Sequence, residues 1–151
     1  MSDSARLIEN LLYSYAERID TGNLEGVADL FTHGCIVTTP EAPVDQVLAG
    51  RDQVLGLYQN SVRLYPCGTP RTKHVTTNAM IEVDDGAGTA AARSYYTVFQ
   101  QLDDFPLQPI ITGRYHDTFH RIDNVWWFDQ RIMLVDHLGD LSRHLLLELK
   151  P

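Results

Sequence analysis

The sequence predicts an α+β fold in which three helices precede four long antiparallel strands. Apolar residues recur at helical spacing only before residue 65, and long β-favouring stretches separated by compact turns follow from residue 71 onward. Helices followed by an antiparallel sheet are typical of the α+β class. A strongly curved sheet wrapped around the helices forms a cone-shaped barrel, and we expect a small-molecule pocket at its wide end.

Length and composition predict that residues 1–151 form a single domain. The chain is 44% hydrophobic and 21% charged, as globular domains are. Its 12 Lys and Arg against 20 Asp and Glu leave a net charge of −8, which disfavours a nucleic-acid partner. No apolar run reaches the roughly 18 to 20 residues of a membrane span, and the first residues show no secretory leader. We therefore expect a cytoplasmic protein with no membrane partner.

The first two helices form a tight hairpin. Five apolar residues on one stripe predict the first helix: Ile8, Leu11, Leu12, Tyr15 and Ile19. Ser4 is its predicted N-cap, and Gly22 with Asn23 ends it. Asn23 also caps a short second helix that carries Val27, Leu30 and Phe31.

A short strand pair and a third helix follow. Residues 35–39 are β-favouring, prolines within residues 40–43 break this strand, and residues 47–50 return as a second short strand. The third helix is predicted from about residue 51 to residue 64, with an apolar side formed by Val54, Leu55, Tyr58 and Val62. Two prolines and a glycine between residues 66 and 70 end it.

Four long strands pair in sequence order into the antiparallel sheet. They occupy residues 73–83, 89–101, 110–121 and 125–136. Residues 84–88 and 122–124 are hairpin turns, whereas residues 103–109, with two prolines, form a longer connection. Residues 139–149 form a tail with a last helical turn capped by Asp140 or Ser142.

Six segments, in this order and spacing, are specific for one group of folds. They are residues 15–23, 30–31, 72–78, 113–119, 127–128 before Arg131, and 139–140. On these segments the chain resembles the SnoaL-like group of the nuclear transport factor 2-like superfamily over nearly its whole length. That superfamily includes dehydratases, isomerases, polyketide cyclases, epoxide hydrolases and non-catalytic dioxygenase subunits, so the resemblance leaves the reaction open. It implies a homodimer or homotrimer formed through the outer face of the sheet.

The closer resemblance is to scytalone dehydratase, bile acid 7α-dehydratase and hexachlorocyclohexane dehydrochlorinase. In these relatives an aspartate at the end of the first helix and a histidine on the first long strand form a catalytic dyad. The matching residues here are Asp20 and His74. The resemblance therefore implies that this pair is catalytic.

The chemistry of the two residues fits a dyad. Asp20 ends the first helix beside the negative end of the helix dipole, where a carboxylate needs compensation. An imidazole that donates a hydrogen bond supplies it, and its other nitrogen is then free to abstract a proton. Strand alternation places His74 on a polar face with Thr76, Asn78 and Met80, opposite a drier face with Val75, Thr77, Ala79, Ile81 and Val83. The alternatives are a solvated turn aspartate and an exposed strand histidine.

Further side chains are candidates to polarise or bind the substrate. Tyr15, five residues before Asp20, is either a third catalytic residue that donates a hydrogen bond to the substrate or a core tyrosine. The predicted substrate-binding residues are Asn78, Arg93, Tyr95, Tyr115, Trp127 and Arg131.

The last predicted strand places an arginine among apolar residues. Arg131 alternates in phase with Val125, Trp127 and Met133. If it points inward, it requires an anionic ligand or an ion pair, and Asp117 and Asp129 are the candidate partners. The adjacent Trp126 and Trp127 point to opposite faces of the same strand, so one packs inside and the other covers the outside.

The sequence indicates no metal site and no cofactor. Besides His74, the histidines are His33, His116, His120, His137 and His144. His116 and His120 share a strand face but stand about 13 Å apart. Cys35 and Cys67 lack metal-ligand spacing, and there is no Gly-rich phosphate loop or nucleophile motif.

The sequence thus predicts a cofactor-independent lyase or isomerase of the dehydratase type. Its substrate would be a hydrophobic, cyclic or aromatic, oxygenated small molecule. His74 would be the general base, Asp20 would orient it, and Tyr15 would polarise the leaving hydroxyl or the carbonyl. The alternatives are a non-catalytic small-molecule-binding or structural subunit, and an enzyme of the polyketide cyclase or hydrolase type.

Overall fold

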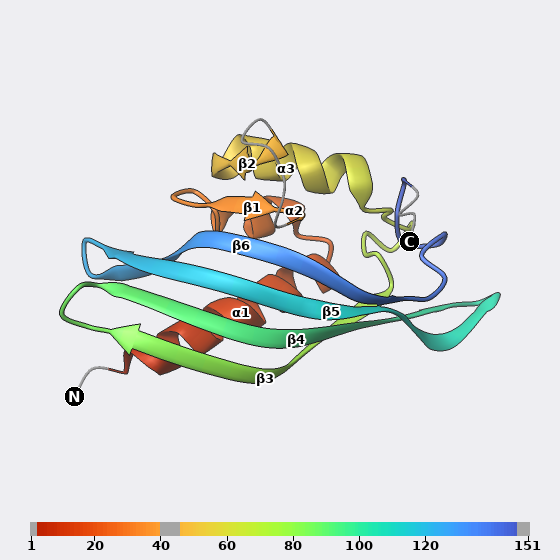
Figure 1. The fold of residues 1–151 in the computed structure, drawn as a ribbon. Helices are drawn as coiled ribbons and strands as arrows, with labels where there is room; N and C mark the ends of the chain where they lie inside the picture. Colours follow the sequence, from red (N-terminus) through yellow and green to blue (C-terminus); the bar gives the residue numbers. More distant parts are fainter. Residues whose placement is uncertain (1–2, 40–45, 148–151) are drawn as a thin grey trace.

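The computed structural model describes residues 3–39 and 46–147, and in this part of the chain three helices pack against a six-stranded sheet (Figure 1). The helices are α1 (Ser4–Asp20), α2 (Leu24–Asp29) and α3 (Gly50–Ser61). The strands are β1 (Cys35–Val37), β2 (Leu48–Ala49), β3 (Thr72–Asp84), β4 (Thr89–Leu102), β5 (Phe105–Ile122) and β6 (Val125–Leu138). The predicted α+β class is confirmed.

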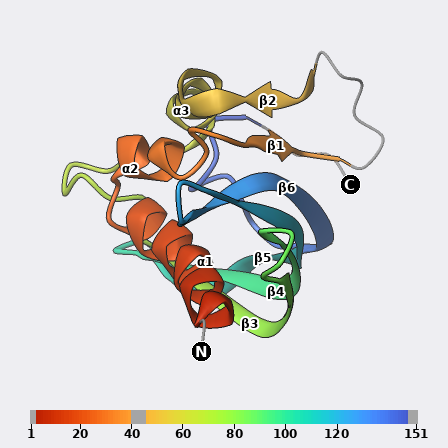
Figure 2. The same cartoon turned by 90° about the vertical axis from the view of Figure 1, so that its left-hand side faces the viewer.

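The sheet has the order β2-β1-β6-β5-β4-β3 and does not close, because β2 and β3 remain at its two edges. The four long strands are antiparallel and paired in sequence order, as predicted. β1 adds to β6 in parallel, which the sequence pattern did not indicate. Viewed along the strands, the sheet curls around α1, which lies against its concave side (Figure 2). The end of α1 therefore meets the start of the edge strand β3.

The apolar stripe of α1 explains why this helix is central. Ile8, Leu12, Tyr15 and Ile19 are each at most 3% exposed. Ser4 does not cap the helix as predicted: Asp3 precedes the first turn, and the Ser4 hydroxyl bonds Asp85 Oδ1 at 2.6 Å. At the other end, the backbone of Gly22 has a φ of +76°, and a Cβ there would stand 1.8 Å from the Gly68 carbonyl oxygen. Glycine is required for this stop.

The short helices follow the prediction at their starts and differ at their ends. The Asn23 side chain accepts the Gly26 N–H at 2.9 Å and caps α2, as predicted. α2 ends at Asp29, so Leu30 and Phe31 are buried in the turn that follows it. α3 ends at Ser61, three residues early, because the backbone of Val62 is extended and pairs with Leu145. The predicted break at residues 40–43 lies outside the described residues.

The connection between β4 and β5 and the C-terminal tail also differ from expectation. Residues 103–109 are not a long connection, because Leu102 pairs directly with Phe105 across a two-residue turn. The two prolines fit within β5 because the register shifts nearby, and bulges leave positions that need no N–H donor. Up to residue 147 the tail contains no helix, and Asp140 Oδ1 accepts the Ser142 N–H in a turn.

Among the bulges of the described sheet, one inverts the faces of β3 and another those of β6. In β3 the register shifts between Thr77 and Met80, where Asn78 has a φ of +55°. His74 and Thr76 face inward before the bulge, whereas Ile81 and Val83 do so after it. The prediction that Val75, Thr77 and Ala79 lie on the drier face is therefore wrong, because all three are exposed. An extra residue in one strand reverses the alternation, and a single strand pattern does not show it.

The second bulge lies where β5 and β6 shift register beyond Thr118. Trp126 and Phe128 are buried before it, and Arg131 is buried after it. Arg131 is thus not in phase with Trp127, contrary to prediction. Of the two tryptophans, Trp126 packs inside and Trp127 lies on the other side of the strand.

Candidate functional site

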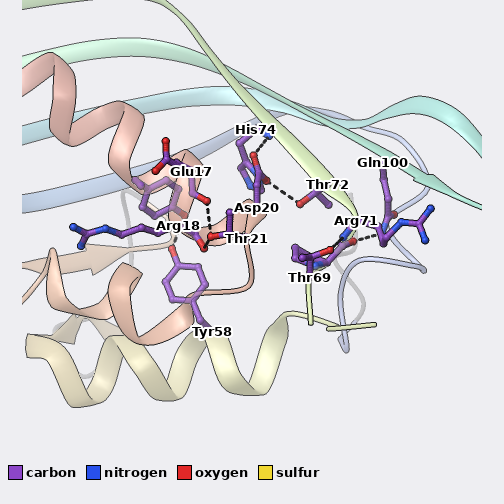
Figure 3. Close-up of polar contacts among 12 residues, drawn as sticks. Glu17, Arg18, Asp20, Thr21, Tyr58, Thr69, Arg71, Thr72, His74 and Gln100 are labelled. Carbon is purple, nitrogen blue, oxygen red and sulfur yellow. Dashed lines mark hydrogen bonds and ion pairs between the residues drawn. The ribbon is translucent and has the colours of Figure 1, made fainter. Parts of the chain in front are cut away.

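The site begins with Asp20, the last residue of α1. Its Oδ1 accepts hydrogen bonds from Thr72 Oγ1 at 2.9 Å and from His74 Nδ1 at 2.6 Å, and its Oδ2 accepts the His74 backbone N–H at 2.7 Å (Figure 3). The backbone donor is free because β3 is an edge strand and carries no neighbour on this side. Three donors thus compensate a carboxylate at the unfavourable end of a helix dipole.

The same contacts determine the protonation of the His74 ring. An ionised carboxylate only accepts hydrogen bonds, so Nδ1 carries the proton and Nε2 keeps its lone pair in the neutral imidazole. The side chains of His74 and Asp20 are 7% and 12% exposed. The arrangement is therefore a shielded, oriented imidazole with one basic nitrogen available.

Two tyrosines meet next to the dyad. The Tyr15 hydroxyl on α1 and the Tyr58 hydroxyl on α3 are 2.5 Å apart, and the Tyr15 ring stands edge-on to the His74 ring at 6.5 Å. Both tyrosines are at most 4% exposed. Burial raises the pKa of Tyr15 and raises that of Tyr58 well above its ordinary value, so both phenols keep their protons at neutral pH.

Tyr58 was predicted only as part of the apolar side of the third helix, and its contact with the Tyr15 hydroxyl was not predicted. The available signal was the residue type, because a buried tyrosine usually finds a hydrogen-bond partner for its hydroxyl. Thr72 was likewise missed as a partner of Asp20. Its position two residues before His74 places it on the same strand face.

Arg131 lies in the core behind Tyr15. It forms a two-pronged ion pair with Asp117, with distances of 2.9 and 3.0 Å, and both side chains are fully buried. The guanidinium also stacks on the rings of Tyr15 at 4.3 Å and Tyr115 at 3.6 Å. Burial lowers the pKa of Arg131, but the Asp117 carboxylate more than offsets this. Of the two predicted partners Asp117 is the observed one, and Asp129 instead accepts a hydrogen bond from Thr118.

A groove of about 330 Å³ runs along the seam between α1 and β3. Asp20 and His74 line it, together with Tyr13, Glu17, Lys73 and Thr76. Its volume falls within the roughly 300 to 1,000 Å³ of small-molecule sites. Under the sheet, by contrast, Tyr15, Tyr58, Tyr115 and Arg131 are at most 4% exposed and pack against one another.

The structure brings only part of the predicted site together. Tyr15, Asp20 and His74 are adjacent, and Arg131 and Tyr115 lie directly behind them. Asn78, Arg93 and Tyr95 are exposed on the outer face, because the β3 bulge and the β4 alternation turn them outward. Trp127 packs against His33 at 4.8 Å.

Residues 3–39 and 46–147 lack two features, a cluster of metal ligands and a membrane-spanning helix. No group of three or more His, Cys, Asp or Glu side chains in these ranges is placed to hold a metal ion. No helix in the same ranges is long and apolar enough to cross a membrane.

Fold and site together define a curved α+β protein, and a solved protein described as NTF2-like with a cystatin-like fold, 19% identical to this chain, shares the fold. More narrowly, the sequence profile of the SnoaL-like domain matches residues 2–132, and the chain belongs to that family. This confirms the predicted resemblance to the SnoaL-like group. No curated protein sequence matches the chain.

Solved structures from several bacteria share the fold. A single-residue variant of Rv3472 from Mycobacterium tuberculosis, a protein of unknown function, is 24% identical, with 89% of this chain and 73% of that chain covered and a TM-score of 0.70. A proposed scytalone dehydratase from Novosphingobium aromaticivorans is 23% identical, with 91% and 87% covered and a TM-score of 0.70. ActVI-ORFA from Streptomyces coelicolor is 15% identical, with 91% and 100% covered and a TM-score of 0.70.

Proposed function

We propose that this protein is a cofactor-independent lyase or isomerase of the dehydratase type. One observation carries the proposal: Asp20 holds His74 through Nδ1, which leaves Nε2 as the basic nitrogen of a shielded imidazole. The substrate class is a cyclic or aromatic small molecule with a carbonyl or hydroxyl group. The structural similarity to a protein named for scytalone dehydratase supports the same class of reaction.

The proposed reaction begins with the removal of a proton from carbon. His74 Nε2 takes the proton from the carbon next to a carbonyl, and the electron pair of the broken C–H bond moves into an enolate. Asp20 stabilises the imidazolium that forms, because its carboxylate already bonds Nδ1. General-base catalysis of this kind contributes about 10² to 10⁴-fold to the rate.

The second step is either elimination or reprotonation. In elimination the enolate re-forms the carbonyl, the bond from the β-carbon to its hydroxyl breaks, and the proton on His74 leaves with the hydroxide as water. In isomerisation the same proton returns to a different carbon. The Tyr15 and Tyr58 hydroxyls, both protonated, supply hydrogen-bond donors near the developing negative charge on oxygen.

A bicyclic β-hydroxyketone, 3-hydroxy-1-tetralone, tests the proposal directly. Loss of its α-proton and β-hydroxyl gives 1-naphthol and water, and naphthol is followed by its fluorescence. We expect the wild-type protein to accelerate this dehydration and His74→Gln to lower the rate by about 10²-fold. His137→Gln is the matched control, because His137 is an exposed histidine on β6 and should leave the rate unchanged. Equal rates for the wild type and His74→Gln would overturn the assignment of the base.

A binding protein without catalysis is the second candidate, and the buried side chains of Tyr15, Tyr58, Tyr115 and Arg131 beneath the sheet favour it. The two functions differ in deuterium exchange at the α-carbon of 1-tetralone, which requires a base but no leaving group. Tight binding of 1-tetralone without any acceleration of exchange would favour the binding protein.

A further inference from the structure

His144 is a buried histidine that the proposed reaction does not use. It is 5% exposed and lies in the segment after β6, which returns toward the end of α3 (Figure 1). Its ring centroid is 6.1 Å from that of His74, with the ring planes at 68°. A second imidazole therefore lies beside the proposed base, although 70 residues separate the two in sequence.

The backbone around His144 is held from two sides. The Arg63 N–H donates to the His144 carbonyl and the Leu146 N–H donates to the Ser61 carbonyl, both at 2.8 Å, which ties the segment to the end of α3. On the other side, the Gln100 amide on β4 donates to the Arg143 carbonyl at 3.1 Å. The Arg143 side chain also pairs with Asp104 in the β4–β5 turn at 3.0 Å. These contacts fix where the imidazole lies.

The ring itself is not satisfied by the protein. His144 Nδ1 is buried and has no hydrogen-bond partner among the described residues. Buried polar atoms in native proteins nearly always have a partner, so an orphaned one requires an explanation. A leucine or phenylalanine would fill the same space without leaving a nitrogen unpaired, and the ring that carries this nitrogen lies next to His74.

The charge state of His144 is suited to a neutral ligand. Burial, and secondarily the neighbouring His74, lowers the pKa of His144 to about 4, while Asp20 opposes the shift. At neutral pH the ring is uncharged, so it does not repel His74 when that residue takes up a proton. A neutral imidazole offers one donor and one acceptor, which match a carbonyl or hydroxyl oxygen.

We propose that His144 is a substrate-contacting residue whose Nδ1 hydrogen-bonds an oxygen of the substrate. This contact would select oxygenated rings over plain hydrocarbons and determine which carbon faces His74. The inference rests on the proposed function, because it places the substrate beside the Asp20–His74 dyad.

Two probes of nearly equal shape test the contact: 1-tetralone, a cyclic ketone, and tetralin, the hydrocarbon without the oxygen. The histidine rings are labelled with ¹⁵N and observed by NMR while each probe is added to the full chain. We expect 1-tetralone, but not tetralin, to shift the His144 ring nitrogens. His144→Phe should weaken 1-tetralone binding by about 10-fold and change tetralin binding by less than about two-fold. His144→Asn, whose amide replaces Nδ1, should restore most of the lost affinity.

The outcomes separate this inference from the proposed function. If 1-tetralone shifts the His74 nitrogens but leaves those of His144 unchanged, the contact is wrong and the dyad assignment stands. If His144→Phe lowers the affinity for both probes equally, His144 has only a packing role and the inference is overturned. If neither histidine responds to either probe, both proposals fail. The labelling measurement uses the wild-type chain and so does not depend on the folding of any variant.

Discussion

Two acid–base pairs among the described residues, one partly buried and one fully buried, are built from similar groups and differ in their surroundings. Asp20–His74 joins the end of a helix to an edge strand and lines a groove, with side chains 12% and 7% exposed. Asp117–Arg131 joins two central strands and is fully buried. In the first pair one ring nitrogen stays basic, whereas in the second the guanidinium is permanently charged and both prongs are occupied.

The location of each pair in the sheet indicates whether its role is structural or chemical. Under the proposed function, the pair at the edge of the sheet exchanges a proton with a ligand in the groove, because its imidazole keeps one unprotonated nitrogen in the neutral form. A pair sealed between strands keeps its charges and orients Tyr15 and Tyr115 by stacking. We therefore expect changes to the central pair to affect stability and changes to the edge pair to affect turnover.

The largest effect is expected from Asp117→Asn. The substitution leaves the buried Arg131 charge without a counter-ion and should lower the free energy of unfolding by about 3 to 5 kcal/mol. Urea denaturation of the wild type and of Asp117→Asn measures this loss of unfolding free energy. Asp136→Asn is the control, because Asp136 pairs with Arg114 at the surface, with side chains 32% and 41% exposed, and should cost less than about 1 kcal/mol. Equal losses in the two variants would contradict the contrast between buried and exposed pairs.

The next largest effect is a pH dependence of stability near the dyad. The pKa of His144 is lowered from 6.5 to about 4 in the folded protein, so the unfolded chain binds more protons between these values. The stability should therefore be complete above about pH 6.5 and should decrease by roughly 3 kcal/mol as the pH falls toward 4.

The measurement compares urea denaturation of the wild type and of His144→Phe at several pH values. The difference between them isolates His144, because both proteins share all other titrating groups. A pH-independent difference would show that His144 does not titrate as its burial requires.

A third prediction concerns Asp20→Asn. The amide weakens the orientation of His74 and no longer balances the imidazolium, so turnover of 3-hydroxy-1-tetralone should fall by about 10²-fold, or about 2.7 kcal/mol. Its loss of unfolding free energy should be smaller than that of Asp117→Asn. A larger loss of stability than of turnover would reverse the roles assigned to the two pairs.

The smallest effect is expected from Tyr58→Phe. The change removes the hydroxyl that meets Tyr15 and should lower turnover by about 10-fold, because the Tyr15 hydroxyl loses the partner that orients it next to His74. Tyr96→Phe serves as control, since the Tyr96 hydroxyl donates to the Leu134 carbonyl at 3.0 Å and not to the dyad. A similar decrease in both variants would indicate a general loss of packing.

Much of the fold follows from local sequence patterns, and the exceptions have a common cause. The stripe from Ile8 to Ile19 predicts α1 correctly, and Asn23 caps α2 as its residue type suggests. The errors arise where distant segments meet. Ser4 bonds Asp85 instead of capping, and Val62 leaves the helix to pair with Leu145. No periodicity within one segment reports such contacts.

In the candidate site, too, some residues were predicted from the sequence and others were not. The residue types and the family resemblance pointed to Asp20 and His74, and Asp117 was one of two named partners for Arg131. Tyr58 and His144 were not recognised as neighbours of the dyad, because α3 and the C-terminal segment reach it only through folding. Asn78, Arg93 and Tyr95 were expected at the site and lie outside it.

Local sequence patterns were enough for the first helix and for the order of the long strands, because these depend on spacing and residue type within short segments, whereas the family resemblance pointed to Asp20 and His74. Only the tertiary structure decided which strand faces point inward. One extra residue in a bulge, as near Asn78, reverses every side chain beyond it without changing the composition of the strand. It also decided that His144 lies beside His74, because that contact depends on hydrogen bonds between segments far apart in the chain.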